Sequence, residues 1–442
     1  MAKGYRIVFQ SFDQDEPDVI LTEQRLLEDI LNMPSHCFDF SMGHSKQIEL
    51  IQTAQDAILN EKSKLIHQEK DKCPECNKNL IKFGKQKSTF YDVFTDHNIK
   101  MQRLKCNHCG YETKSTVRTF LGTTLSGDLK KIQASLGANF TYRESEQILG
   151  LFSDSDRVIN NHDRVKHITE YVGNRVAKIS EIEKEIITVE EANELILHVD
   201  GGHIKTIEDK RSIEALASVV YRPESLLSNP KDTRNYLDSK NCAASVNDDN
   251  QEQLISGTII AALKQGLTAN TRITALCDGA ANCWHVVDAL KPLCASMMCI
   301  LDWFNLAMKI ENISLPEVLK TKLLRIKWHL WRGHVERALI RLEQLMELAK
   351  DEKHIERIKK FTQYINNNKE RIVNYRERQK KGLIFTSSLA ESTVENLINH
   401  RCKGQQHMRW SRDGNPLLQL RAAINSKDDC SKKWRTAVLN TI

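Results

Sequence analysis

Long apolar runs are missing from this 442-residue sequence, and no uninterrupted apolar stretch is long enough to span a bilayer. The amino end, MAKGYRIVFQSFDQDE, lacks the apolar core of a secretory signal and meets acidic residues early. Proline and glycine are scarce, and there is no internal repeat or low-complexity tract. With 40% hydrophobic and 28% charged residues, the sequence is typical of a soluble globular protein. We expect a cytoplasmic protein with no membrane partner.

A strong net charge is also missing, because the formal value is only +6 and identifies no partner by itself. The distribution of charge says more. Lysine and arginine outnumber acids from Lys100 to Lys131 and again from Arg401 to Arg421. Clustered cations of this kind suit a phosphate backbone, which they attract by charge and counterion release. For either cluster alone, a solvated charged face is an equally good interpretation.

The sequence has twelve cysteines but no signal peptide, so a disulfide framework is not expected. Four of them, Cys73, Cys76, Cys106 and Cys109, form two C-x2-C pairs. Two such pairs can bring four thiolates to one tetrahedral Zn²⁺, and strand-like sequence between them predicts a zinc ribbon. This zinc would be structural, because four protein ligands leave no open position. A redox dithiol would need only one pair, and His108 is interpreted as a bystander.

Residues 127–180 carry a helical pattern with a break at Gly137, a second helix near Thr141 and a third after Ser153. Thr141 with Glu144, and Ser153 with Asp154, are plausible helix caps. Three short helices with tight turns predict a helix-turn-helix unit. An ordinary helical linker is the alternative, and we favour DNA binding because the segment follows a metal ribbon and a basic run.

From Glu194 the pattern changes to alternating strands and helices, so the fold class is multidomain α/β. Asp200 and Asp278 each end an apolar strand and precede a glycine. Neighbouring strands would bring both carboxylates to one sheet edge, where a divalent cation relieves their repulsion. Taken singly, each could be a turn former or cap. Residues 306–382 are almost wholly helical and too charged for a buried core, which predicts a solvated helical hairpin.

The strings HVDGGHIK, ALCDGAANCW, ILDWFNLAMKI and LAESTVENLINHRCKGQQHMRWSRDG give a more specific indication. Together they resemble bacterial insertion-sequence transposases of the DDE type, most closely the ISKra-type group. The resemblance implies an RNase H-like catalytic core with a helical insertion. Position by position, Asp200 and Asp278 match the first two acids and Glu391 matches the third, with Glu395 one helical turn away as the fallback.

That resemblance implies a DNA transposase that uses Mg²⁺ or Mn²⁺ to cut transposon ends and join them to target DNA. Its partners would be both DNAs and, on DNA, further copies of the chain, with a nucleoid-associated location. One position departs from the family, since Asn305 stands where related enzymes often carry histidine. A catalytically inactive or domesticated DNA-binding protein, or a hydrolytic nuclease of the same fold, therefore remain alternatives.

The cations expected to contact DNA are Arg103, Lys105, Lys130, Lys131, Arg401, Lys403, Arg409 and Arg412. The expected domains are a helical or irregular region (1–70), the zinc ribbon (71–126), the helix-turn-helix-like region (127–190), the first part of the core (191–310), the helical insertion (311–383) and the last part of the core with the third acid and a basic tail (384–442).

Overall fold

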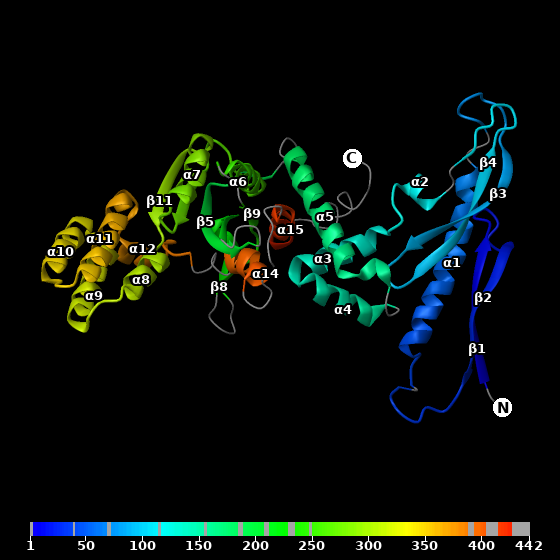
Figure 1. Cartoon of the computed structure of the whole chain (residues 1–442), viewed down its shortest axis with the longest axis horizontal. Helices are drawn as coiled ribbons and strands as arrows, with labels where there is room; N and C mark the ends of the chain where they lie inside the picture. Colours follow the sequence, from blue (N-terminus) through cyan, green and yellow to red (C-terminus); the bar gives the residue numbers. More distant parts are fainter. Residues whose placement is uncertain are drawn as a thin grey trace. The chain divides into compact units, whose positions relative to one another are not determined.

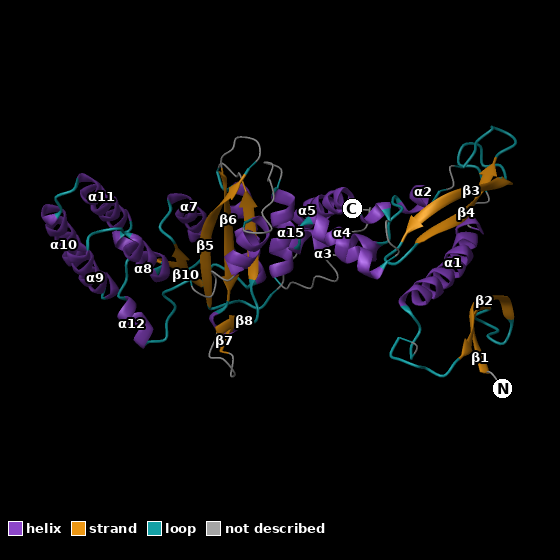
Figure 2. Cartoon of the chain, turned by 60° about the horizontal axis from the view of Figure 1, so that its bottom comes forward, coloured by secondary structure: helices purple, strands orange, loops and turns teal. Residues whose placement is uncertain are grey.

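The computed structural model describes residues 3–38, 40–68, 72–113, 116–153, 157–183, 189–206, 212–228, 235–246, 250–387, 393–403 and 414–426. These residues form two compact units (Figures 1 and 2). The first contains residues up to 137 together with 142–168, and the second contains 138–141 and the residues from 169 onward. The division runs through the segment that the sequence predicts to be a helix-turn-helix-like region.

The first unit begins with an antiparallel hairpin and a long helix, followed by a second hairpin and a group of short helices. Its elements are β1 (Lys3–Phe12), β2 (Ile20–Leu31), α1 (His44–Gln68), β3 (Ile81–Tyr91), β4 (Asp96–Lys105), α2 (Val117–Leu121), α3 (Gly127–Asn139), α4 (Tyr142–Phe152), η1 (Val158–Asn160) and the start of α5 (His162–Glu183).

The β3–β4 hairpin packs one face against α1. Along β4, His97, Ile99 and Met101 are buried while Asn98 and Lys100 are exposed, as the two-residue period of a strand requires. His97 Nδ1 lies 2.8 Å from the Asp56 carboxylate of α1, so the buried imidazole has a polar partner. The alternation predicted for this stretch is thereby confirmed.

The helical group is tied to the same hairpin by a buried arginine. Arg157 Nε donates to Asp96 Oδ1 at 2.8 Å, and its Nη atoms donate to the carbonyl oxygens of Val93 and Asp92. The break between the first two helices falls after Asn139 and not at Gly137, because the helix continues through this buried glycine.

The second unit is built on a five-stranded mixed sheet with the order β11-β10-β5-β6-β9. Strands β5, β6 and β9 are antiparallel neighbours, whereas β10 and β11 run parallel to β5. The strands are β5 (Glu194–Lys205), β6 (Ser212–Tyr221), β9 (Asn241–Val246), β10 (Arg272–Cys277) and β11 (Ser296–Leu301), with a small pair β7 (Leu226–Ser228) and β8 (Asn235–Leu237) after η2 (Pro223–Ser225). The alternation of strands and helices predicted from Glu194 onward is found, and the α/β class is confirmed.

Two helices cover one face of this sheet, and the apolar residues that alternate along the strands point toward them. Leu195 and Leu197 of β5 share this core with Ala275 of β10 and with Val286 and Val287 of α7. The remaining elements associated with the sheet are α6 (Glu252–Lys264), α7 (Ala281–Leu290), η3 (Lys291–Leu293), η5 (Glu395–Asn399), α14 (His400–Cys402) and α15 (Asn415–Asn425), which packs on β9.

A helical bundle follows β11, made of α8 (Trp303–Asn312), α9 (Glu317–Trp331), α10 (Val335–Leu348), α11 (Glu352–Asn367), η4 (Lys369–Arg371) and α12 (Tyr375–Lys380). The prediction of a solvated hairpin without a core was wrong. Leu323, Leu330, Leu342 and Ile365 are all nearly inaccessible to solvent. Apolar residues recur every three or four positions, so they form a narrow buried stripe while the many charges occupy the outer faces.

Candidate functional site

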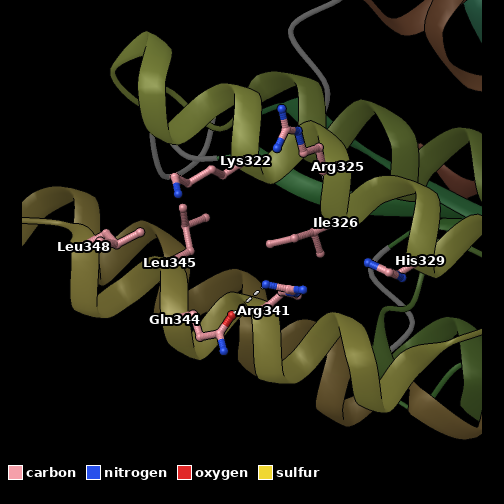
Figure 3. A pocket seen from close by; sticks show the side chains of 8 residues that line it. All are labelled: Lys322, Arg325, Ile326, His329, Arg341, Gln344, Leu345 and Leu348. Carbon is pink, nitrogen blue, oxygen red and sulfur yellow. Dashed lines mark hydrogen bonds between the residues drawn. The ribbon is translucent and has the colours of Figure 1, made fainter.

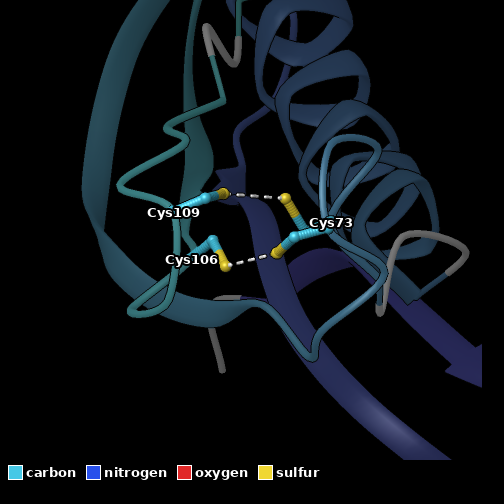
Figure 4. Close-up of side chains that lie close together, drawn as sticks. Cys73, Cys106 and Cys109 are labelled. Carbon is cyan, nitrogen blue, oxygen red and sulfur yellow. Dashed lines mark hydrogen bonds between the residues drawn. The ribbon is translucent and has the colours of Figure 1, made fainter.

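Four cysteine side chains converge beside the β3–β4 hairpin (Figure 4). The sulfur atoms of Cys73 and Cys109 are 3.5 Å apart, those of Cys76 and Cys106 are 3.4 Å apart, and all four lie within 4.8 Å of one another. A tetrahedral Zn²⁺ with Zn–S bonds of about 2.3 Å would separate its sulfurs by roughly 3.8 Å. The cluster therefore fits a metal ion such as zinc.

Two similar turns position these sulfurs. The Asn77 amide donates to the Cys73 carbonyl, and the Gly110 amide donates to that of Cys106. Asn77 and Gly110 both have positive φ, 56° and 80°, which residues of these types tolerate best. Backbone N–H groups of Cys109 and His108 point at the Cys106 sulfur and lower the pKa of this thiol to about 6, whereas burial and the neighbouring sulfurs raise the pKa of Cys109.

Three aspartates lie at the same level on three adjacent strands of the five-stranded sheet. Asp278 and Asp302 directly follow β10 and β11, whereas β5 was predicted to end at Asp200 and instead continues to Lys205. Val199 of β5, Cys277 of β10 and Leu301 of β11 lie side by side in register. The next residue of each strand is an aspartate, namely Asp200, Asp278 and Asp302. Parallel strands lie about 4.8 Å apart, so this register brings the backbones of the three acids to one edge. The adjacency predicted for Asp200 and Asp278 is found.

Asp200 and Asp278 are half-buried and line one narrow cavity, together with Asn305, Ser387 and others. Each carboxylate is oriented by a local amide, since Asp200 Oδ1 accepts from Gly201 N at 2.8 Å and Asp278 Oδ1 accepts from Ala280 N at 2.8 Å. Carboxylate oxygens are preferred ligands of Mg²⁺, which keeps its remaining positions for water and phosphate. Two carboxylates in one cavity are donors of the kind that such an ion prefers.

Asp302 lines the same cavity but is only 1% exposed, and its oxygens are engaged by the chain itself. Oδ1 accepts from Ser387 N at 2.6 Å, while Oδ2 accepts from Asn305 N and from Ser387 Oγ at 2.9 Å each. Burial raises the pKa of Asp302 despite these bonds. Asp302 thus caps α8 and fixes Ser387. Among the described residues, only the cysteines form a metal-binding group of three or more.

Glu391, the predicted third acid, lies outside the described residues. Ser387 before it and Val394 after it both line the acidic cavity. The fallback acid Glu395 is exposed and accepts a hydrogen bond from Asn399 Nδ2. It does not line the cavity.

The predicted DNA-contacting cations occupy different environments. Lys403 lies beside β5, because its Nζ would lie 2.8 Å from a Cβ added at Gly202, two residues after Asp200. Arg103 and Lys105 both pair with Glu112, whereas Lys131 is exposed. Lys130 and Arg401 are almost inaccessible to solvent, so neither presents its charge to a ligand in this conformation. Arg409 and Arg412 lie outside the described residues.

The roles of several side chains near the acids could not be recognised from the sequence. The Tyr364 hydroxyl of α11 donates to the Asp278 carbonyl at 2.7 Å, and its ring lies 2.8 Å from where a Cβ on Gly279 would be. Gly279 has a φ of 95°, so the turn after Asp278 requires glycine on both counts. Trp284 packs in the core, with its Nε1 donating to Asn368 Oδ1.

Comparison of the chain with protein-family models and with curated proteins gives no match. Within the described residues, no helix combines the length and apolar character needed to cross a membrane.

Proposed function

We propose that this chain is a DNA transposase that cleaves transposon ends and transfers the freed strand to target DNA. The observation that carries the proposal is the pairing of Asp200 and Asp278, which follow in-register residues of adjacent parallel strands and line one cavity. The five-stranded mixed sheet is compatible with the RNase H-like core that the sequence resemblance implies. Half-exposed paired carboxylates at such an edge favour phosphoryl chemistry over a purely structural role.

In this proposal Asp200 and Asp278 hold Mg²⁺ or Mn²⁺, and Glu391 completes the site. The bound ions would neutralise phosphate charge and activate the attacking oxygen. Water first attacks the phosphorus at the element's end and displaces the 3′ oxygen, leaving a 3′ hydroxyl. That hydroxyl then attacks a target phosphorus and displaces the target's own 3′ oxygen. The protein contributes positioning: Gly201 and Ala280 amides orient the carboxylates, and Lys403 contacts a phosphate.

The first unit would bind DNA and hold it for the core. We propose that its cysteine cluster with the β3–β4 hairpin is a zinc ribbon, and that α3, α4 and α5 form a helix-turn-helix. The close sulfur atoms support the first assignment. Three consecutive helices, the first two joined by a two-residue turn, support the second. Since two ends must be paired, the active complex would contain at least two copies of the chain.

The test is cleavage and joining of DNA that carries the ends of the encoding element, in Mg²⁺ or Mn²⁺. We expect Asp278→Asn to abolish both reactions while DNA binding is retained. Asp288→Asn is the matched control, because Asp288 is exposed on the neighbouring helix α7 and pairs with Lys291 of the same segment. Equal activity of the wild type and Asp278→Asn would show that Asp278 is not part of the active site.

A second comparison tests the third acid. Glu391→Gln should remove cleavage, whereas Glu395→Gln should retain it, because Glu395 is exposed and already bonded to Asn399. The reverse pattern would transfer the role to Glu395.

Asn305 favours a second candidate, a DNA-binding protein without catalysis. Its side chain lines the acidic cavity and cannot transfer a proton near neutral pH. Binding of end DNA without cleavage by the wild-type chain, in either metal, would select this candidate. Hydrolysis without joining would instead select a nuclease of the same fold.

A further inference from the structure

A groove of about 240 Å³ lies between α9 and α10 of the helical bundle (Figure 3). Its floor is apolar and includes Ile326 and Leu345. Its rim is basic, with Lys322, Arg325 and His329 contributed by α9 and Arg341 by α10. Figure 3 shows Ile326 and His329 entering the space from one helix and Arg341 from the other. The groove shares no lining residue with the acidic cavity.

The rim cations are not neutralised by the chain. No acidic side chain lines the groove, and neither Lys322, Arg325 nor Arg341 makes an ion pair with any carboxylate that the structure describes. Other cations of this bundle do find such partners, since Lys327 pairs with Glu311 and Lys360 with Glu356. The groove therefore concentrates unpaired positive charge, whereas Lys327 and Lys360 elsewhere in the bundle are paired with carboxylates.

Helical spacing explains this concentration. Lys322, Arg325 and His329 lie three and four residues apart, so they share one face of α9. Arg341 faces them from α10 and donates through Nη1 to Gln344 Oε1 at 3.1 Å, which holds the guanidinium at the groove. Burial, together with neighbouring cations led by Arg341, lowers the pKa of His329. An anion in the groove would relieve this crowding of positive charge.

We propose that the α9–α10 groove binds phosphate groups, either of a nucleic-acid backbone or of a free inorganic phosphate. Two guanidinium groups and an ammonium on the two helices that line the groove match the charge of phosphate groups. A backbone phosphate brings an apolar sugar with it, which the Ile326 and Leu345 floor accommodates. The site is separate from the acids and requires no catalysis, so it stands or falls independently of the proposed function.

The test compares two triple variants of the full chain, each built in the Asp278→Asn background so that no strand is cut. One replaces Lys322, Arg325 and Arg341 by glutamine. The matched control replaces Lys350, Lys353 and Lys359 by glutamine, which removes the same charge from exposed positions outside the groove. Binding of fluorescein-labelled duplex DNA is measured by anisotropy across a salt series, and thermal unfolding verifies that both variants are folded.

If backbone phosphates occupy the groove, the groove variant should bind DNA at least tenfold more weakly than the control. Its slope of log affinity against log salt should be smaller by about 2 to 3, because up to three phosphate contacts are lost. In a second arm, inorganic pyrophosphate is titrated calorimetrically. Pyrophosphate binding that the groove variant alone loses, with DNA binding unchanged, would assign the groove to a free phosphate. If the groove variant matches the control in both arms, the phosphate site does not exist.

Discussion

Replacing Asp302 by asparagine tests whether this residue positions α8 and Ser387 or binds a metal ion. The Asp302 carboxylate accepts three hydrogen bonds, from the backbone of Asn305 and from both the backbone and hydroxyl of Ser387. An amide offers one oxygen, so one buried N–H group must face an NH₂ group whichever way the side chain turns. Asparagine is a good helix cap, so we expect its side-chain oxygen to keep the hydrogen bond from the Asn305 amide. The hydrogen bond from the Ser387 amide would then be lost.

The magnitude follows from two opposing effects. Leaving a buried donor without an acceptor costs about 1–3 kcal/mol. Burial raises the pKa of Asp302, so the neutral amide also avoids the desolvation of a buried charge. We therefore expect Asp302→Asn to lower the free energy of unfolding by about 1–2 kcal/mol, toward the lower end of that range.

Urea denaturation of Asp302→Asn, Ser387→Ala and the double variant measures this directly. Because the two residues are in contact, their effects should be non-additive by at least about 0.5 kcal/mol. Amide exchange at Ser387 should accelerate in Asp302→Asn, while metal-dependent cleavage should be slowed and not abolished. A variant with wild-type stability and unchanged exchange at Ser387 would refute the assigned role, and complete loss of cleavage at full stability would make Asp302 a metal ligand.

Three further outcomes are expected. The chain should contain one zinc, and Cys106→Ser should lose it together with the far-ultraviolet signal of the β3–β4 hairpin; a zinc-free but fully folded wild type would contradict this. Burial lowers the pKa of His198 to about 3 from an unfolded value near 6.5, so the folded state binds fewer protons than the unfolded state. The free energy of unfolding should therefore decrease as pH falls from about 6.5 toward 3, by roughly 1.4 kcal/mol per pH unit. His198→Phe should flatten this dependence in denaturation series between pH 4 and 6, and an unchanged slope would exclude His198 as its source. Leu342→Ala should lower the free energy of unfolding by about 2–4 kcal/mol, because Leu342 is buried in the bundle. Ile340→Ala, at an exposed site on the same helix, should lower it by under about 0.5 kcal/mol. Equal effects of the two substitutions would show that the bundle has no buried core at Leu342.

The sheet and the two-acid edge could be predicted because their signals are local. An apolar run that ends in aspartate and glycine identifies a buried strand at both Asp200 and Asp278. It identifies the strand boundary only at Asp278, because β5 continues past Asp200 to Lys205. The cysteine cluster could be predicted equally well, because two C-x2-C pairs indicate that four sulfur atoms lie close together without knowledge of the fold.

The roles of Asp302, Ser387 and Tyr364 could not be predicted, because each depends on a contact between residues far apart in sequence. Asp302 and Ser387 are separated by 85 positions, and Tyr364 reaches Asp278 across 86. The bundle was misjudged for another reason. Its total charge is high, but burial depends on which face carries the charge, and the apolar stripe of Leu323 and Leu330 recurs at helical spacing.

The hydrogen bonds between Asp302 and Ser387 also determine how freely the bundle can vary. The chain leaves the sheet after Asp302 and returns at Ser387, and the Trp303 amide donates to the Phe385 carbonyl beside this closure. The whole excursion is thus a loop whose two ends are pinned at its base. Closure entropy rises only slowly with loop length, so helices could be added, shortened or exchanged there at small thermodynamic cost. This arrangement would let the bundle diverge in sequence and size while the acidic edge beneath it stays unchanged.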